Sequence, residues 1–362
     1  MTGFEMLSKG TPLLLASVLL GGGCDGERGQ LAPDQGARGD AVSEESRPAE
    51  GEPNKPEIVE PKAEEPEAPA PELPLILKGF DHPDTVIHDP EADVYLLSNI
   101  GTGPGVEDRS GFISRISPRG EILARKWVDG ERMPEAYSPK GMALIDSWLI
   151  VNNIESTQFV SRERGSLRMD RAGGAERYDA AIIDNEKRLI QTDARREDEG
   201  PELGKEPTVY VTEGHEHFGE MGRGLDSPFG VLEWKRGPQH PRGLALRGDA
   251  LLLVTLEGGL WELQYQSYGE HGLTDGWRAT VERLGSKKGN PKQLEGIVVL
   301  DDGRLLVSSV ETGTVYEVSP DGMQWKALIE QLPGPGGIGL DRKRQRLLIP
   351  CMTSDELRVH QL

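Results

Sequence analysis

Five ionisable residues stand near the starts of short apolar runs that recur along the chain. They are Asp84, Lys140, Asp179, Arg242 and Glu295. Carboxylates can hold a divalent cation or take a proton from water, whereas lysine and arginine can bind a carboxylate or a phosphate. Because these residues are far apart in the sequence, they can act together only if the fold brings the starts of the runs to one place.

The runs belong to a repeat with six phases. Each phase has a turn, a short apolar run, a charged turn, and a second run that ends in small polar residues. The first runs are 82–87, 138–143, 177–182, 240–245, 293–298 and 335–340. The second runs are 94–99, 148–153, 208–213, 251–255, 304–309 and 346–350. A third run follows in several phases and alternates apolar with polar residues, as half-buried strands do.

Groups of three to four strands that recur every ~40 to 60 residues predict an all-β chain folded as a six-bladed β-propeller. A propeller must close on itself, because an unpaired sheet edge invites aggregation. The last phase ends at Leu362 without an outer strand of its own, and residues 75–79 form an apolar run at the other end of the domain. We therefore expect residues 75–79 to complete the last blade.

The N-terminal segment differs from the repeat. An apolar run at 11–20, too short to span a bilayer, is followed by three glycines and Cys24. Residues 1–24 resemble a bacterial lipoprotein signal peptide, with Cys24 as the lipidated residue. Lys9 is the only basic residue before the apolar core, and Gly21 stands where leucine is usual. The alternatives are a plain secretory signal, or a wrongly assigned start followed by a buried helix.

Residues 25–74 have the composition of a linker. They contain fourteen Asp or Glu residues, five Lys or Arg residues, nine prolines and no aromatic residue. Such a segment cannot bury enough apolar surface to offset the entropy lost on ordering. We predict a disordered acidic tether between a lipid anchor and the domain at 75–362, which places the domain at the cell envelope, facing the periplasm or the cell exterior.

The charge of the domain bears on its partners. The whole chain has a formal net charge of −20, and residues 75–362 contribute −11 of it. An acidic surface argues against nucleic acid as a partner. Apart from Cys24 the chain has only Cys351, so no disulfide is expected once Cys24 is acylated. We expect a monomeric domain that reaches the membrane only through its anchor.

Several segments resemble the senescence-marker-protein/gluconolactonase family of six-bladed propellers, and most closely its bacterial secreted branch. They are 86–99, 111–118, 138–143, 338–342 and 347–350. The resemblance covers about residues 75–362, with an insertion near 190–230. It implies a funnel at the axis in which a Glu, one or two Asn and an Asp hold one divalent ion, calcium or zinc (Ca2+ or Zn2+), and an acidic residue helps to activate water.

Carried over to this chain, the resemblance implies Asp84, Asn153 and Glu295 as metal ligands. It also implies Asp84, Asp179 and Glu295 as candidate catalytic residues. The remaining funnel residues would bind the ligand, and they are Lys140, Arg242, Asn99, Asn153, Glu213 and Ser309. The chain departs from the family in several places: Asp84 stands where Glu is usual, Ser309 where Asp is frequent, and Lys140 and Arg242 where Asn is common.

Three interpretations of the funnel stay open. The metal is retained; or the charges pair among themselves; or Lys140 and Arg242 hold an anionic ligand. Two functions follow. The first is a lipid-anchored propeller that binds a small ligand or a partner at its funnel and has a degenerate metal site. The second is a lactonase or esterase that depends on a divalent metal.

Other residues give weaker signals. The segment 213–217 contains two histidines and two glutamates, which could bind zinc or copper, but its glycine and the neighbouring insertion favour a polar loop. His82 and His240 precede prolines and are predicted to be turn residues. Cys351 follows an apolar run and is expected to be buried and inert.

Overall fold

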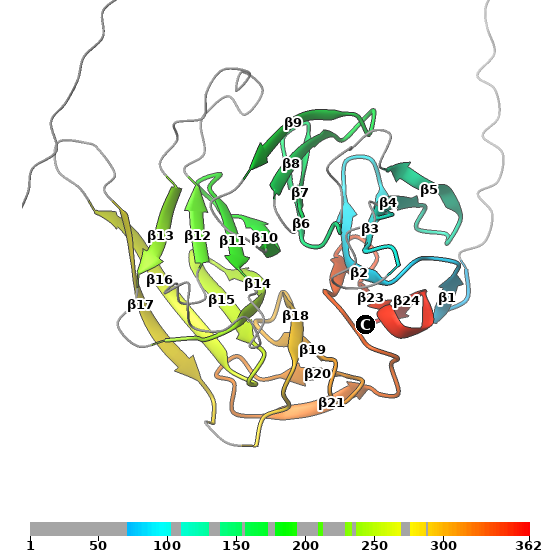
Figure 1. The fold of residues 1–362 in the computed structure, drawn as a ribbon. Coiled ribbons are helices and arrows are strands. Elements are labelled where there is room, and N and C mark those ends of the chain that lie inside the picture. Colours follow the sequence, from blue (N-terminus) through cyan, green and yellow to red (C-terminus); the bar gives the residue numbers. More distant parts are fainter. Residues whose placement is uncertain are drawn as a thin grey trace, which may run out of the picture. The chain divides into compact units, whose positions relative to one another are not determined.

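The computed structural model describes residues 71–102, 110–129, 138–153, 156–172, 178–193, 209–212, 229–233, 237–268, 276–286 and 289–362. In these ranges the regular structure is almost entirely β, and the sheets stand radially around an axis as the blades of a six-bladed propeller (Figure 1). The predicted fold is confirmed. No helix within these ranges is long and apolar enough to cross a membrane. The predicted signal peptide with Cys24, and nearly all of the predicted linker, lie outside them.

Five blades follow chain order from the axis outward. Blade 1 consists of β2 (Pro83–Asp89), β3 (Val94–Asn99), β4 (Phe112–Ile116) and β5 (Ile122–Val128). Blade 2 consists of β6 (Met142–Ile145), β7 (Trp148–Asn152), β8 (Ser156–Ser161) and β9 (Leu167–Ala172). Blade 3 consists of β10 (Tyr178–Ile183), β11 (Leu189–Asp193), β12 (Val209–Thr212) and β13 (Phe229–Glu233). Blade 4 consists of β14 (Pro241–Arg247), β15 (Ala250–Thr255), β16 (Leu260–Tyr268) and β17 (Gly276–Leu284). Blade 5 consists of β18 (Leu294–Val299), β19 (Leu305–Ser309), β20 (Thr314–Val318) and β21 (Trp325–Ile329).

The sixth blade joins the two ends of the domain. It contains β22 (Gly339–Asp341), β23 (Arg346–Cys351), β24 (Glu356–Gln361) and, on its outer edge, β1 (Leu75–Lys78). β1 pairs antiparallel with β24, so that Leu75 lies opposite Val359 and Lys78 lies opposite Glu356. The expectation that residues 75–79 complete the last blade is confirmed.

Blade 3 corrects one assignment. We predicted 208–213 as its second strand, but β11 is second and β12 is third. The carboxylate of Asp184 accepts hydrogen bonds from the backbone N–H groups of Glu186 and Arg188, at 2.9 and 2.8 Å, and so holds a short hairpin between β10 and β11. The prediction missed β11 because Gln191 and Thr192 interrupt its apolar pattern, although both are fully buried.

The outer edges of blades 3 and 4 are also joined. β13 pairs in parallel with β17, with Leu232 opposite Trp277 and Glu233 opposite Arg278, so the two blades form one eight-stranded sheet. Each of the other blades is a separate four-stranded sheet. The edge strand β13 therefore finds a partner in the neighbouring blade, which is one way to protect a sheet edge.

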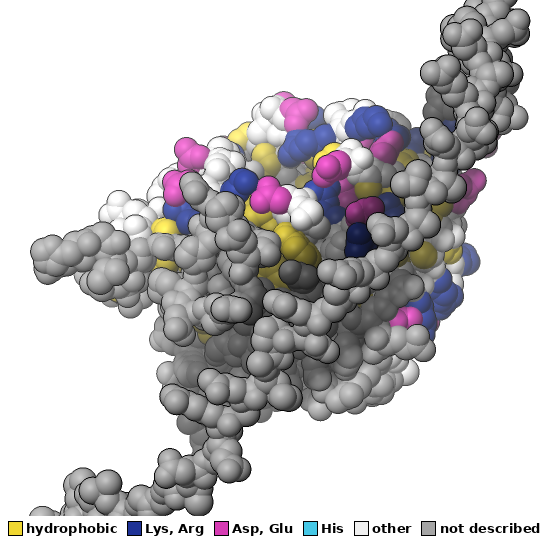
Figure 2. All heavy atoms as spheres, turned by 90° about the horizontal axis from the view of Figure 1, so that it is seen from above, with side chains coloured by type: hydrophobic (Ala, Val, Ile, Leu, Met, Phe, Trp, Pro, Cys, Tyr) yellow, Lys and Arg dark blue, Asp and Glu magenta, His cyan; other side chains and the backbone are white. Residues whose placement is uncertain are grey.

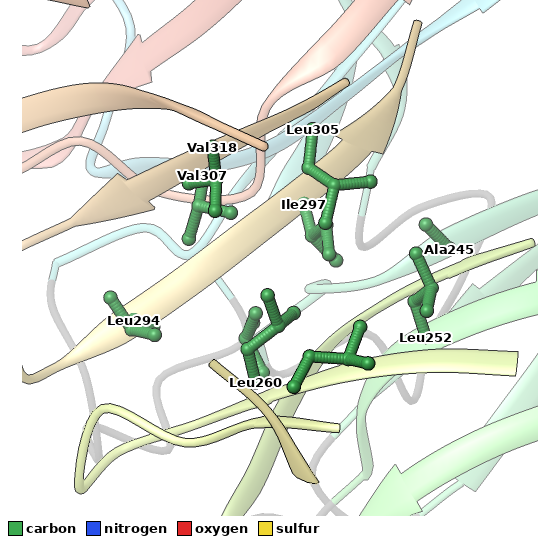
Figure 3. Packing of buried hydrophobic residues seen from close by; sticks show 10 residues of the cluster. Ala245, Leu252, Leu260, Leu294, Ile297, Leu305, Val307 and Val318 are labelled. Atoms are coloured by element: carbon green, nitrogen blue, oxygen red, sulfur yellow. The ribbon is translucent and has the colours of Figure 1, made fainter. Parts of the chain in front are cut away.

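Apolar side chains pack between neighbouring blades. Figure 3 shows such a cluster, in which Leu252 and Leu260 of blade 4 face Leu294, Ile297 and Leu305 of blade 5. The middle strands β15 and β19 are buried along their whole length, which explains their continuous apolar runs. Burying each such side chain stabilises the fold by about 1.5–3 kcal/mol.

The surface carries charges of both signs. Figure 2 shows one side of the domain, where acidic and basic side chains are interspersed. Exposed ion pairs include Lys187 with Asp146, whose Nζ–Oδ1 distance is 3.1 Å, and Arg304 with Asp302, at 2.7 Å. Pairs of this kind add little to stability, because water and salt screen them.

Candidate functional site

A cavity of about 440 Å³ follows the axis of the propeller. The innermost strands of all six blades line it. Asp84, Asp179 and Glu295 line one end, apolar side chains line the middle, and His88 and Arg342 lie towards the other end. We call the end with the three carboxyl groups the channel mouth.

β-Bulges position four of the charged residues at the channel mouth. The ladder skips two residues in each of four innermost strands, between Pro83 and Val86, Tyr178 and Ala181, Pro241 and Leu244, and Leu294 and Ile297. The first residue skipped is charged in every case, and the four are Asp84, Asp179, Arg242 and Glu295. A bulge bends the strand and re-aims its side chain, and bulges are common beside functional sites.

The bulges are supported by hydroxyl groups that the sequence analysis did not single out. The backbone N–H groups of Thr85, Ala180 and Gly296 donate hydrogen bonds of 3.0, 2.9 and 2.8 Å to three side-chain oxygens, those of Ser98, Thr192 and Ser308. A bulged residue loses its ladder partner, and each hydroxyl replaces that partner. The signal in the sequence was the small polar residues at the ends of the second runs. In two of these runs we selected the residue that follows the supporting hydroxyl, which is Asn99 instead of Ser98 and Ser309 instead of Ser308.

Two glycines let adjacent innermost strands approach closely around the axis. A Cβ atom on Gly141 would lie 2.1 Å from the carbonyl oxygen of Asp179, and one on Gly243 would lie 2.4 Å from that of Glu295. Contacts this short are impossible for any other residue. Packing therefore requires glycine at the third position of the turns 139–141 and 241–243. Lys140 and Arg242 are the residues that precede these two glycines.

The charged groups converge on Asp179. Lys140 Nζ lies 2.8 Å from Asp179 Oδ1, and Arg242 Nη1 lies 3.2 Å from Asp179 Oδ2. Glu295 is held more loosely, with Oε1 3.9 Å from Arg242 Nε. Asp84 accepts a hydrogen bond of 2.9 Å from the Thr85 hydroxyl. The channel mouth thus joins side chains from five blades, with three carboxyl groups against two cations.

Because the carboxyl groups outnumber the cations, their pKa values shift in different directions. Burial opposes the ionisation of Asp179, but the charges of Lys140 and Arg242 outweigh it and lower the pKa of Asp179 to about 2. Burial raises the pKa of Glu295 to about 8, which the charge of Arg242 offsets only in part. Burial also raises the pKa of Asp84, against the lowering effect of Lys140. Asp179 is therefore a fixed anion, whereas Glu295 is mostly protonated at neutral pH and can donate a hydrogen bond.

Of the predicted site residues, only Asp84, Asp179 and Glu295 line the cavity, and Lys140 and Arg242 join the site through their ion pairs with Asp179. Three of the other predicted funnel residues bond within their own blades. The Asn99 side chain accepts a hydrogen bond from the backbone N–H of Asp81 at 3.1 Å, Asn153 donates to Gln158 at 2.8 Å, and Ser309 donates to the carbonyl of Lys292 at 2.7 Å. All three are buried, and they hold turns or strands within their blades. Glu213 and the rest of the segment 213–217 lie outside the described residues.

The residues at the channel mouth do not fit a metal ion. Calcium needs several oxygen ligands, and a cation beside them competes with the ion. Here Lys140 forms an ion pair with Asp179, and Asn153, whose side-chain amide donates to Gln158, is not among the residues that line the cavity. In the described ranges no group of three or more His, Cys, Asp or Glu side chains is placed to hold a metal.

Cys351 and the two turn histidines take no part in this site. Cys351 is buried, and burial raises the pKa of its thiol to about 12. The ring of His82 bonds to the carbonyl of Gly101 at 2.9 Å, and the ring of His240 contacts Glu257. Both histidines have positive φ angles, 47° and 44°, two residues before Asp84 and Arg242. They shape the turns that lead into the bulges.

A second charged cluster ties blade 1 to the sixth blade, and we call it the closure network. Fully buried Asp341 accepts hydrogen bonds from the Tyr95 hydroxyl at 2.8 Å, from Arg344 Nη1 at 3.1 Å and from the Arg344 backbone N–H at 3.0 Å. The Arg344 guanidinium also forms two bonds with Asp93, at 2.7 and 2.6 Å. The bonds from Arg344 hold the pKa of Asp93 well below its usual range. The pKa of Asp341 is also lowered, because the bond from Tyr95 and the charge of His88 outweigh burial.

Comparison with known proteins identifies relatives by structure alone. No protein-family model matches the sequence, and no curated protein matches it. Among solved structures, a gluconolactonase from Xanthomonas campestris is 18% identical, with 79% of this chain and 89% of that chain covered and a TM-score of 0.52. A luciferin-regenerating enzyme is 12% identical, with coverage of 80% and 96% and a TM-score of 0.55.

A third solved structure, provisionally named a gluconolactonase, is 13% identical, covers 80% of this chain and 93% of its own, and has a TM-score of 0.56. At such identities the likeness shows the fold and not the activity. The chain described here has the fold of a gluconolactonase-like six-bladed propeller.

Proposed function

We propose that this protein binds a small polar molecule at the channel mouth, in a site that needs no metal. The position of Glu295 is the observation that carries this proposal. Its carboxyl group lines the cavity, and its one ion-pair contact in the described chain is 3.9 Å long. A carboxyl group removed from water is costly unless it has hydrogen-bond partners, and a bound ligand would supply them.

The chemistry of the site indicates what the ligand offers. Protonated Glu295 is a donor, Lys140 is a donor, and Arg242 Nε is buried without a hydrogen-bond partner. These groups favour carbonyl, hydroxyl or carboxylate oxygens. Asp179 already neutralises much of the charge of both cations. We therefore propose a ligand that is uncharged or carries one negative charge, such as a lactone or a hydroxy acid.

Calorimetry with a panel of lactones and hydroxy acids tests this proposal. Arg242→Gln should weaken binding by about tenfold or more, because it removes a charged donor from a buried site. Arg304→Gln, in an exposed ion pair, is the matched control and should leave affinity unchanged. Equal affinities for the Arg242 variant and the wild type, or no binding across the panel, would overturn the proposal.

A second candidate is hydrolysis of a lactone or ester, in which Asp84, Asp179 or Glu295 takes a proton from water. The pKa of about 8 at Glu295 favours it, because general acid–base catalysis works best with a pKa near the working pH. In the form that depends on calcium or zinc, the purified protein should contain the metal, and a chelator should abolish turnover. A metal-free protein that binds lactones without turnover selects the binding function.

The role of the two cations can be tested separately. If Lys140 and Arg242 take the place of a metal, then Lys140→Asn combined with Arg242→Asn should raise calcium affinity, because the three carboxylates would lose their competitors. Unchanged calorimetric titrations of the double variant would contradict this account. The single variants give the contribution of each cation.

We also propose that Cys24 is lipidated and anchors the protein at the cell envelope. The support is the sequence: a short apolar run, three glycines and Cys24, followed by an acidic proline-rich segment. Mass spectrometry should find an acylated N-terminal cysteine. Cys24→Ser should release the protein from the membrane fraction, and a membrane-bound Cys24→Ser protein would refute the anchor.

A further inference from the structure

We infer that the ligand of the channel mouth carries an aliphatic chain, which lies along the central channel behind the charged residues. The inference rests on the proposed binding site and adds the class of ligand. It starts from the lining of the cavity beyond the mouth, where every blade contributes an apolar side chain. These are Ile87, Leu144, Ile183, Leu246, Val299 and Leu340.

The cavity is deep enough for a chain. In blade 5 its lining runs from Glu295 to Val299, and in blade 1 it runs from Asp84 to His88. Four residues of a strand span about 13 Å, at ~3.3 Å per residue. The volume of about 440 Å³ is in the range of small-molecule sites. A polar ligand confined to the mouth would leave most of this length unfilled.

The apolar side chains keep surface available to a ligand. Six residues that line the channel, one from each blade, are only half-buried, and they are Ile87, Leu144, Ile183, Leu246, Val299 and Leu340. Apolar surface that faces a cavity is stabilised when an apolar group covers it. An aliphatic chain does this in all six blades at once.

The far end of the channel does not call for a second polar group on the ligand. His88 Nε2 lies 3.2 Å from Asp93 Oδ1, and Arg342 Nη2 donates to the carbonyl of Val299 at 2.8 Å. Arg342 also pairs with Asp301. Both side chains already have partners, whereas the Glu295 carboxyl at the mouth has one ion-pair contact, which is 3.9 Å long. The polarity of the site therefore fits one polar head and one apolar tail.

The channel mouth selects the polar head of the ligand. Its donors suit a carbonyl oxygen, so the class is an aliphatic lactone, ester or carboxylic acid. These share an acyl carbonyl and differ in charge. A lactone and a fatty acid with the same chain length distinguish them, because only the acid brings a charge to the two cations.

A chain-length series on the full chain tests the inference. The probes are γ-butyrolactone, γ-octalactone and γ-dodecalactone, with dodecanoate as the acid, measured by calorimetry while product formation is followed in the same samples. Affinity should rise by about fourfold per added methylene until the channel is filled. If turnover occurs, kcat/KM should rise in the same way.

Variants locate the chain in the channel. Leu246→Gln puts a polar group in the lining and should lower the ratio of dodecalactone to butyrolactone affinity by about tenfold or more. Val299→Thr, from another blade, is a milder change that serves if the first variant does not fold. Leu123→Gln on the exposed face of β5, where Leu123 is 53% exposed, is the control and should leave the ratio unchanged.

The outcomes separate this inference from the proposed function. Short lactones that bind in an Arg242-dependent way, with no gain along the series, overturn the aliphatic chain and leave the binding site intact. A gain along the series that both channel variants leave unchanged places the chain elsewhere and also overturns the inference. No binding by any probe, in a folded protein, overturns both.

Discussion

The channel mouth and the closure network are built from the same residue types but differ in how completely their carboxyl groups are paired with cations. In the closure network, Asp341 and Asp93 each receive at least two hydrogen bonds at 2.6–3.1 Å, and Arg344 serves both. At the channel mouth, Asp179 takes both cations while Glu295 is left 3.9 Å from its nearest one. The pKa values of Asp93 and Asp341 are lowered, whereas those of Glu295 and Asp84 are raised.

The difference separates a structural cluster from a candidate site. A buried ionic network in which every group is satisfied fixes geometry, and it leaves nothing for a ligand to contact. An unbalanced cluster destabilises the fold and persists where a function requires it. The closure network joins two blades and its charges are fully paired, whereas the channel mouth opens on a cavity and leaves Glu295 loosely held. Both properties favour the channel mouth as the functional site.

The largest expected effect is at the closure network. Asp341→Ala leaves the Tyr95 hydroxyl and part of Arg344 without an acceptor in a fully buried place, and should lower the free energy of unfolding by about 3–5 kcal/mol. Equilibrium urea unfolding measures it. Tyr95→Phe, which keeps the Arg344 pair, should cost only about 1 kcal/mol. A loss below 1 kcal/mol for Asp341→Ala would mean that the two clusters do not differ as we describe.

A smaller effect with a clear pH dependence is expected at Glu295. Its pKa rises from 4.5 to about 8 on folding, so the folded state binds the proton more tightly. The stability that this provides is complete below about pH 4.5 and is lost as the pH rises through about 8. Glu295→Gln should therefore be more stable than the wild type by roughly 2 kcal/mol at about pH 9 and show no such gain at about pH 4.5.

Urea unfolding of both proteins across that range measures the difference. Parallel stability curves for the variant and the wild type would contradict the raised pKa of Glu295. In contrast, carboxylates with lowered pKa values, such as Asp93, lose stability as the pH falls, so the comparison must be made between variants at each pH.

The smallest effect is expected at Thr85. Thr85→Val removes the hydroxyl that donates to Asp84, and should cost about 1 kcal/mol at a pH where Asp84 is ionised and less where it is protonated. Thr85→Ser keeps a hydroxyl and is the matched control. If the valine variant is equally stable at both pH values, the hydroxyl does not act on the charged form of Asp84.

The sequence predicted the architecture because apolar runs report burial directly. The continuous runs at β3, β15, β19 and β23 are strands buried on both faces, and their spacing identified the blades. The same reasoning placed residues 75–79 on the last blade. It failed at β11, where Gln191 is fully buried through bonds to Asn152 and Thr157 at 2.5 and 2.8 Å, a compensation that no local pattern reveals.

The site was harder to predict because it depends on strand register. The repeat located Asp84, Asp179, Arg242 and Glu295 at the starts of the first strands, where the structure has them. The repeat did not reveal the bulges, which shift each of these residues out of register with the neighbouring strand. Successive residues of a strand point to opposite faces, so an error of one position exchanged Ser98 for Asn99 and Ser308 for Ser309.

The pairing of β1 with β24 has a consequence for synthesis. The strand that completes the sixth blade begins at Leu75, and its partner ends at Gln361, so the first and the last strands of the domain close the ring together. The ring therefore closes only after both strands have been synthesised, and a fragment that lacks β24 leaves β1 without its partner.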